Sequence, residues 1–259
     1  MTYPYNYLVR IQYLGFRYRG WMWQRNVKTV QEMVEKTLCF VLEHKRFKVL
    51  GAGRTDAMVS ANDYCFQLFM RERIDMDQLV KDLNNNIPSD IRVMGMKPIV
   101  GEFNIIQSAK EKEYVYIFAH GEKFHPFCAP FMAFIPGELD IPLMIEGAKL
   151  FEGDHNFRWF CARPGAFTTF DRRIESCELK VNDLHTASFF PEKSYMLSVV
   201  GKGFLRYQIR FMMGTLFKLG ANEISLEDIK LALTGAGEEQ LTHPAPSSGL
   251  VLNRLEYDK

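Results

Sequence analysis

The chain has 259 residues, a formal net charge of +1 and a hydrophobic content of 47%. These values are ordinary for a globular protein and leave room for one large domain or two small ones. No stretch approaches the ~20 apolar residues of a membrane helix, and the first residues lack an apolar signal segment. The five cysteines are scattered without a Cys-x-x-Cys pair, which argues against a disulfide framework and a zinc site. We therefore expect a cytoplasmic protein without a membrane anchor or a structural metal.

The first part of the chain alternates strand and helix patterns. Strands are predicted over residues 7–13, 47–50, 64–69 and 91–96. Helices are predicted over residues 30–42 and 75–85, the first opened by the capping box of Thr29 and Glu32. The resulting β-α-β-β-α-β order is that of a ferredoxin-like unit, which we assign to residues 1–103.

A second unit is predicted over residues 104–259. Its strands are expected at 114–118, 173–181, 195–200 and 250–257. Its helices are expected at 140–151, at 204–219 and after Ser225, with a proline-punctuated loop over 126–137. Gly220 is predicted to end the helix of residues 204–219 in the left-handed conformation. The fold class is therefore α+β in two halves.

Basic and aromatic residues share three windows of the sequence that contain no acidic residue. These windows are residues 1–31, 155–170 and 193–222. Basic groups interleaved with aromatic rings suit phosphate contacts combined with stacking on unpaired bases. Most of the individual aromatic residues are expected to be core, but the windows together favour a nucleic-acid partner. The candidate RNA-binding residues are Arg17, Arg19, Arg25 and Arg206.

The segment Gly51-Ala-Gly-Arg-Thr-Asp-Ala57 lies between two predicted strands and reads as a polar turn. It is not a dinucleotide-binding loop, since Asp56 stands where a third glycine is needed and a strand follows. It lacks the Gly-Lys-Ser/Thr of a phosphate-binding P-loop. Taken alone, the segment is equally well explained as a hairpin turn with an incidental ion pair.

The word Gly-Ala-Gly-Arg-Thr-Asp-Ala-x-Val resembles the active-site loop of the TruA family of tRNA pseudouridine synthases. The resemblance extends over nearly the full length, including Tyr13–Trp21 and Ser248–Leu250. It implies two ferredoxin-like (RRM-like) halves that share a mostly antiparallel sheet with a central cleft. It also implies a homodimer that isomerises uridine in the anticodon stem-loop of tRNA, at positions 38–40, without a cofactor.

The reaction detaches uracil from C1′ of its ribose and rejoins it through C5, which calls for an ionised carboxylate. Asp56 supplies it, as a nucleophile at C1′ or as the base that removes the 2′-proton. A buried lone carboxylate tends to become protonated unless a nearby cation keeps it charged, and Arg54 is too close in sequence to be assumed as that partner. By resemblance, Arg210 pairs with the aspartate, Tyr114 packs against the target base, and Arg54 helps to extract the nucleotide.

The chain departs from the family pattern in the same loop. The family usually continues Asp-Ala-Gly-Val-His, whereas this chain has Met58 and Ser60 in place of the glycine and the histidine. We expect these changes to alter the backbone path after Asp56 and to bear on which uridine is modified. They leave open a non-catalytic RNA-binding protein, or a synthase with another RNA target. A metal-dependent nuclease would have Asp75 and Asp77 as its only paired carboxylates.

Overall fold

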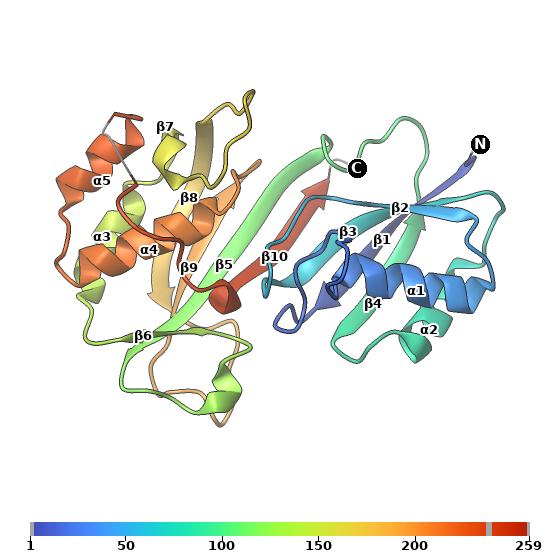
Figure 1. Ribbon diagram of the computed structural model, residues 1–259, viewed down its shortest axis with the longest axis horizontal. Coiled ribbons are helices and arrows are strands. Elements are labelled where there is room, and N and C mark those ends of the chain that lie inside the picture. The colour runs from blue at the N-terminus through green and yellow to red at the C-terminus, as the bar shows by residue number, and fades with distance from the viewer. Residues whose placement is uncertain (1–2, 237–239, 258–259) are drawn as a thin grey trace. The chain divides into compact units, whose positions relative to one another are not determined.

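The computed structural model describes residues 3–236 and 240–257, which form two compact units (Figure 1). Unit 1 consists of Met1–Lys110 together with Leu252–Lys259, and unit 2 of Glu111–Val251. The architecture is mixed α and β, with largely antiparallel strand pairing in both units. Within the described residues, none of the helices has the length and apolar character needed to cross a membrane.

Unit 1 contains every strand and helix predicted for the first part of the chain. Its elements are β1 (Tyr5–Tyr13), α1 (Val30–Leu42), β2 (Phe47–Gly51), β3 (Ser60–Met70), α2 (Met76–Asn86) and β4 (Ile91–Pro98). The strands pair antiparallel in the order β4-β1-β3-β2. The end of the last strand, β10 (Leu250–Tyr257), also lies beside β3, where the amide of Asn62 donates to the side chain of Asn253 at 2.9 Å.

Side-chain caps start both helices of unit 1 at the predicted residues. The hydroxyl of Thr29 accepts a hydrogen bond from the backbone N–H of Glu32, and Asp75 accepts one from Gln78. Such caps satisfy donors that the first turn leaves unpaired. The buried face of α1 carries Val30, Val34 and Leu38, and α1 packs beside α2 (Figure 1).

Unit 2 is built on β5, which spans Ala109–Gly121 and crosses from one unit into the other. Its remaining elements are β6 (Ala133–Pro136), α3 (Ile141–Lys149), β7 (Gly153–Asn156), β8 (Asp171–Val181), β9 (Tyr195–Gly201), α4 (Gln208–Gly220) and α5 (Leu226–Leu233). The antiparallel sheet runs β5-β9-β8-β7, with β6 parallel to β5. Short 3₁₀ turns cover Pro126–Cys128, Arg158–Phe160 and Ser247–Gly249.

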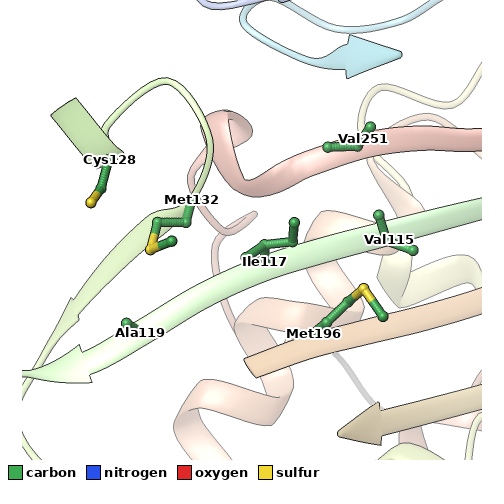
Figure 2. Close-up of a cluster of buried hydrophobic side chains, with 7 residues drawn as sticks. All are labelled: Val115, Ile117, Ala119, Cys128, Met132, Met196 and Val251. Carbon is green, nitrogen blue, oxygen red and sulfur yellow. The ribbon is translucent and has the colours of Figure 1, made fainter. Parts of the chain in front are cut away.

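The alternation of side chains along β5 separates two packing layers in unit 2. Val115, Ile117 and Ala119 belong to a core cluster on one face; its other members are Cys128, Met132, Met196 and Val251 (Figure 2). On the other face, the rings of Tyr116 and Phe118 pack edge-on against Phe217 of α4. Because side chains two residues apart share a face of a strand, Tyr114 lies on the α4 side.

Four details of unit 2 differ from the sequence prediction. A short strand, β6, lies within the segment expected to be a proline-rich loop, and β7 was not predicted. Helix α4 begins at Gln208 instead of residue 204, because Tyr207 before it has a left-handed φ of 65°. Gly220 lies within α4, and the left-handed residue beyond the helix is Asn222. Local propensity missed these points because tertiary contacts decide the ends of short elements.

Candidate functional site

The Gly51–Ala57 segment is, as predicted, a connection between two antiparallel strands, β2 and β3. Arg54 is exposed and Asp56 is half-buried, while Thr55 between them is only 9% exposed. The hydroxyl of Thr55 accepts a hydrogen bond from the backbone N–H of Trp21 at 3.1 Å and lies 3.0 Å from the hydroxyl of Tyr13. The buried side chain of Thr55, with its two polar contacts, therefore anchors the backbone between Arg54 and Asp56.

A second segment, residues 13–21, packs against the loop and holds it in place. Gly20 has a φ of 91°, and a Cβ there would lie 2.3 Å from the carbonyl oxygen of Thr55, so only glycine allows this approach. The N–H of Met58 donates to the carbonyl of Tyr18 at 2.9 Å, and the N–H of Gly15 donates to the hydroxyl of Ser60 at 2.9 Å. The loop is thus held on both sides of Asp56.

Met58 and Ser60, the two departures from the family pattern, each have a distinct role in the conformation of the loop. Met58 has a φ of 67°, which is the left-handed region that glycine adopts at lower cost. A side chain in this region costs about 1 to 2 kcal/mol. Ser60 is buried and accepts the hydrogen bond from Gly15. The loop after Asp56 therefore combines a strained methionine with a structural serine.

Trp21 of the first basic window and two aromatic residues of β3 pack together behind the loop. Trp21 is 2% exposed and lies against Tyr64 and Phe66, with ring centroids 4.3 Å and 5.8 Å apart. The hydroxyl of Tyr64 donates to the carbonyl oxygen of Gly53 at 2.6 Å. The three rings are buried core residues, which for Trp21 agrees with the expectation for most aromatics of the windows, and they stiffen the loop.

The basic residues of the same window divide into two groups. Arg10 pairs with Asp63, and Arg17 pairs with Asp90, whose carboxylate also accepts a hydrogen bond from the hydroxyl of Tyr18 at 2.7 Å. Arg19 and Arg25 are exposed. The structure thus gives Arg17 an internal partner, although its side chain remains 51% exposed.

In unit 2, Arg210 lies on α4 and is oriented by the segment 242–246. Its Nε donates to the carbonyl oxygen of Ala245 at 2.7 Å, and its own carbonyl accepts from the N–H of Ala245 at 2.9 Å. Its guanidinium carbon lies 4.6 Å from the centre of the Tyr207 ring. Gly214 permits this arrangement, because a Cβ there would come within 2.4 Å of the carbonyl oxygen of His243.

Tyr114 lies on the same side of unit 2. It is half-buried, and its ring meets that of Phe204 edge-on at 5.3 Å. Its neighbour on that face, Tyr116, is fully buried and donates to the carbonyl oxygen of Pro246 at 2.7 Å. Burial raises the pKa of Tyr116 above its usual range, although the nearby Arg210 opposes this shift. The carbonyls of Ala245 and Pro246 thereby link α4 to β5.

Arg206 precedes α4 and is exposed, with its guanidinium carbon 5.3 Å from the Tyr207 ring. The predicted helix over residues 204–219 would place Arg206 and Arg210 one turn apart on the same side, but this is wrong because the helix begins after Arg206. Both arginines instead contact the ring of Tyr207, whose left-handed backbone ends the irregular segment before α4.

The predicted site residues thus form one group in each unit. Arg54 and Asp56 share the loop of unit 1, while Tyr114 and Arg210 lie on one face of unit 2, near Arg206. Because Asp56 and Arg210 belong to different units, their pairing stays a prediction. Asp75 is the cap of α2, and Asp77 lies in its first turn. Among the residues that the structure describes, no cluster of histidine, cysteine, aspartate or glutamate is suited to a metal ion.

Sequence reasoning missed the residues that position these groups. Thr55 and Ser60 were read only as parts of a motif, and Ala245 was not singled out. Glycines followed by large aromatic residues, as in Gly15-Phe and Gly20-Trp, are the signal that could have pointed to a close backbone approach. The contacts themselves are long-range in sequence.

The sequence of this chain is similar to those of several known proteins of one family. A family model described as tRNA pseudouridine synthase matches residues 148–258. The tRNA pseudouridine synthase A of Dictyoglomus thermophilum is 31% identical over 255 residues, covering 97% of this chain and 99% of that protein. The tRNA pseudouridine synthase A of Aquifex aeolicus is 32% identical, covering 96% and 98%. The tRNA pseudouridine synthase A 2 of Desulfotalea psychrophila is 32% identical, covering 97% and 98%.

Proposed function

Because this chain belongs to the tRNA pseudouridine synthase A (TruA) family of isomerases, we propose that it converts uridine to pseudouridine in the anticodon stem-loop of tRNA. The family resemblance points to positions 38–40. The observation that carries the proposal is the anchored loop, in which the buried hydroxyl of Thr55 bonds to Trp21 and lies against Tyr13. Such anchoring restricts the position of Asp56, the carboxylate that the chemistry requires.

Asp56 is the catalytic residue of this proposal. An ionised carboxylate next to C1′ either attacks that carbon and forms a covalent intermediate, or removes the 2′-proton so that the base leaves. In both routes the glycosidic bond breaks and the uracil ring turns. C5 then bonds to C1′ as the ester to Asp56 breaks, in the first route, or as C2′ regains its proton, in the second, and the C5 proton is lost. The half-buried position of Asp56 suits a group that must meet a substrate and stay ionised.

Arg210 is the proposed counter-ion of Asp56, and its support lies in its own surroundings. The Nε atom is held by Ala245 and the guanidinium lies over Tyr207, so the head group is directed by two contacts. Tyr114 is proposed to pack against the target base, since its half-buried ring is already braced by Phe204. Arg54 is exposed beside Asp56 and is proposed to replace the extracted nucleotide in the stem.

The proposed RNA-binding surface includes Arg17, Arg19, Arg25 and Arg206. Arg19, Arg25 and Arg206 are exposed, as phosphate contacts require. Arg17 contributes the exposed part of a side chain that is also bound to Asp90. We further propose that the chain forms two ferredoxin-like halves around a central cleft. We also propose that it is a homodimer, which sedimentation would detect. Its proposed location is cytoplasmic, which cell fractionation would test.

The decisive experiment uses tRNA carrying tritium at C5 of uridine. Asp56→Asn should abolish tritium release while changing the affinity for tRNA by no more than a few-fold. Asp63→Asn, another carboxylate on a strand of unit 1, is the matched control and should retain release. A wild-type protein that binds tRNA but releases no tritium would favour the non-catalytic alternative. Mapping pseudouridines in tRNA from a deletion strain would identify the target position.

A further inference from the structure

The second basic window, residues 155–170, contains one exposed loop that the proposed site does not use. Residues 162–170, the tip loop, connect the 3₁₀ turn Arg158–Phe160 to strand β8. In the turn at the tip of this loop, the side chain of Phe167 is 99% exposed. A single exposed apolar residue is common on protein surfaces. The surroundings of Phe167 are what make it informative.

The base of the tip loop is firmly attached to unit 2. Phe157 and Phe160 are buried, and the indole N–H of Trp159 donates to the carbonyl oxygen of Ala236 at 2.9 Å. The N–H of Ala162 donates to the carbonyl oxygen of Arg206 at 3.0 Å. The tip loop therefore starts directly beside Arg206, which belongs to the proposed RNA-binding surface.

The tip itself is a defined turn. The N–H of Thr168 donates to the carbonyl of Gly165 at 3.1 Å, while the N–H of Gly165 donates to the hydroxyl of Thr168 at 2.9 Å. This reciprocal pair closes the turn and leaves Phe167 outside it. A pre-formed turn that presents a ring loses little conformational entropy when the ring binds.

The charged residues of this window are all positive. Arg158 and Arg163 are exposed, no acidic residue occurs between residues 155 and 170, and Arg206 adds a third cation next to the loop. The guanidinium carbon of Arg158 lies 5.0 Å from the centre of the Phe170 ring, so cation and ring already share this surface. The neighbouring Asp171 accepts a hydrogen bond from Asn156 at 2.9 Å.

We propose that the tip loop is an additional contact surface for tRNA, in which Phe167 stacks on an unpaired base and Arg163 contacts a neighbouring phosphate. This rests on the proposed function for the identity of the RNA. A polyanion with exposed planar bases matches an exposed ring on a segment that carries two exposed arginines and no acidic residue. A protein partner would need a larger apolar area than one side chain provides.

The test compares binding of unmodified tRNA by filter retention across a series of salt concentrations. Phe167→Ala should raise the Kd for tRNA about five- to a hundredfold at constant salt, with an unchanged salt slope. Phe167→Trp should keep the affinity near that of the wild type. Arg163→Gln should lower the slope of log K against log[salt] by about one. The matched control is Phe40→Ala, because Phe40 is 70% exposed on α1 and should leave binding unchanged.

The readouts separate this inference from the proposed function. Turnover at saturating tRNA should be the same for Phe167→Ala and the wild type, with the loss confined to KM. If the wild type releases no tritium but Phe167→Ala still weakens tRNA binding, the proposed reaction fails and the contact surface stands. If Phe167→Ala binds tRNA as tightly as Phe40→Ala does, or changes only the oligomeric state in sedimentation, the contact surface is wrong.

Discussion

The side chain of Thr55 carries more of the local structure than its place between two charged residues suggests. Its hydroxyl accepts a hydrogen bond from the backbone N–H of Trp21, a donor that lies in a buried segment and needs a partner there. Thr55→Val keeps the shape but leaves this donor unpaired, which costs about 1 to 3 kcal/mol of stability. Displacement of Asp56 should also lower kcat by about tenfold to a hundredfold, because small errors in placement are costly in catalysis.

Tritium-release kinetics and urea unfolding would measure both effects of Thr55→Val. The KM for tRNA should stay within a few-fold, since Thr55 is buried. Thr55→Ser retains the hydroxyl and should recover most of kcat. Equal losses of kcat in the serine and valine variants would show that the hydroxyl does not position Asp56.

Asp90 is a second residue that stabilises the segment of residues 13–21, through the charge of its carboxylate. Burial opposes its ionisation, but hydrogen bonds from Arg17 and Tyr18 outweigh burial and hold the pKa of Asp90 below its ordinary value of 3.8. A carboxylate with a lowered folded-state pKa adds stability above its unfolded-state pKa, and this is lost as the pH falls through the folded-state pKa. The stabilisation by Asp90 should therefore be complete near pH 7, begin to fall below about pH 4, and be lost once the pH is below the folded-state pKa.

Urea unfolding of Asp90→Asn and wild type at several pH values would test this dependence. The variant should be less stable at pH 7, and the difference should shrink as the pH falls below 4. Asp183→Asn is a suitable comparison, because Asp183 is an exposed carboxylate paired with Lys180 in the other unit. A difference for Asp90→Asn that is constant from pH 7 to pH 2.5 would contradict an electrostatic origin.

Among the elements, α4 depends on one glycine for its contact with the segment that orients Arg210. Alanine is the better helix former, so helix propensity alone predicts that Gly214→Ala is stabilising. The structure predicts the opposite, because the added Cβ would meet the backbone carbonyl of His243 at 2.4 Å. We expect a loss of about 1 to 3 kcal/mol in unfolding free energy, together with a reduced kcat.

The control for Gly214→Ala is Gly203→Ala. Gly203 lies in the segment before α4, where an added Cβ would have no atom within 4 Å. Urea unfolding should find this variant close to the wild type. If Gly214→Ala is as stable and as active as Gly203→Ala, the close contact between α4 and residues 242–245 does not constrain the helix.

The boundaries of elements show where sequence patterns reach their limit. The caps at Thr29 and Ser225 were predicted and start helices in the structure, while Asp75, predicted as the first residue of a helix, is the cap before α2. The start of α4 was placed four residues early, because its apolar pattern continues through Phe204 and Leu205 into an irregular segment. Periodicity reports which residues are buried, but it does not report where the backbone leaves the helix.

For the whole molecule, a net charge of +1 conceals a strongly uneven distribution. Arg206 is exposed in an acid-free window, so it is available to neutralise a phosphate. Arg206→Ala should weaken tRNA binding and lower the salt slope by about one. Arg173→Ala is the control, because Arg173 already pairs with Asp154 and Glu175. Filter binding from 50 to 300 mM salt would measure both slopes, and equal slopes for the two variants would place Arg206 outside the RNA surface.

The amino-acid sequence alone determined the succession of major strands and helices, the loop that carries Asp56, and the resemblance that led to the family. These features are local, since periodicity, caps and a continuous motif each occupy a short stretch of chain. The tertiary structure alone decided that Thr55 meets Tyr13 and Trp21, and that Ala245 orients Arg210. It also decided that the end of β10, residues 252–257, joins unit 1. Such contacts join residues tens or hundreds of positions apart, and they depend on how complementary surfaces pack, which a local pattern does not encode.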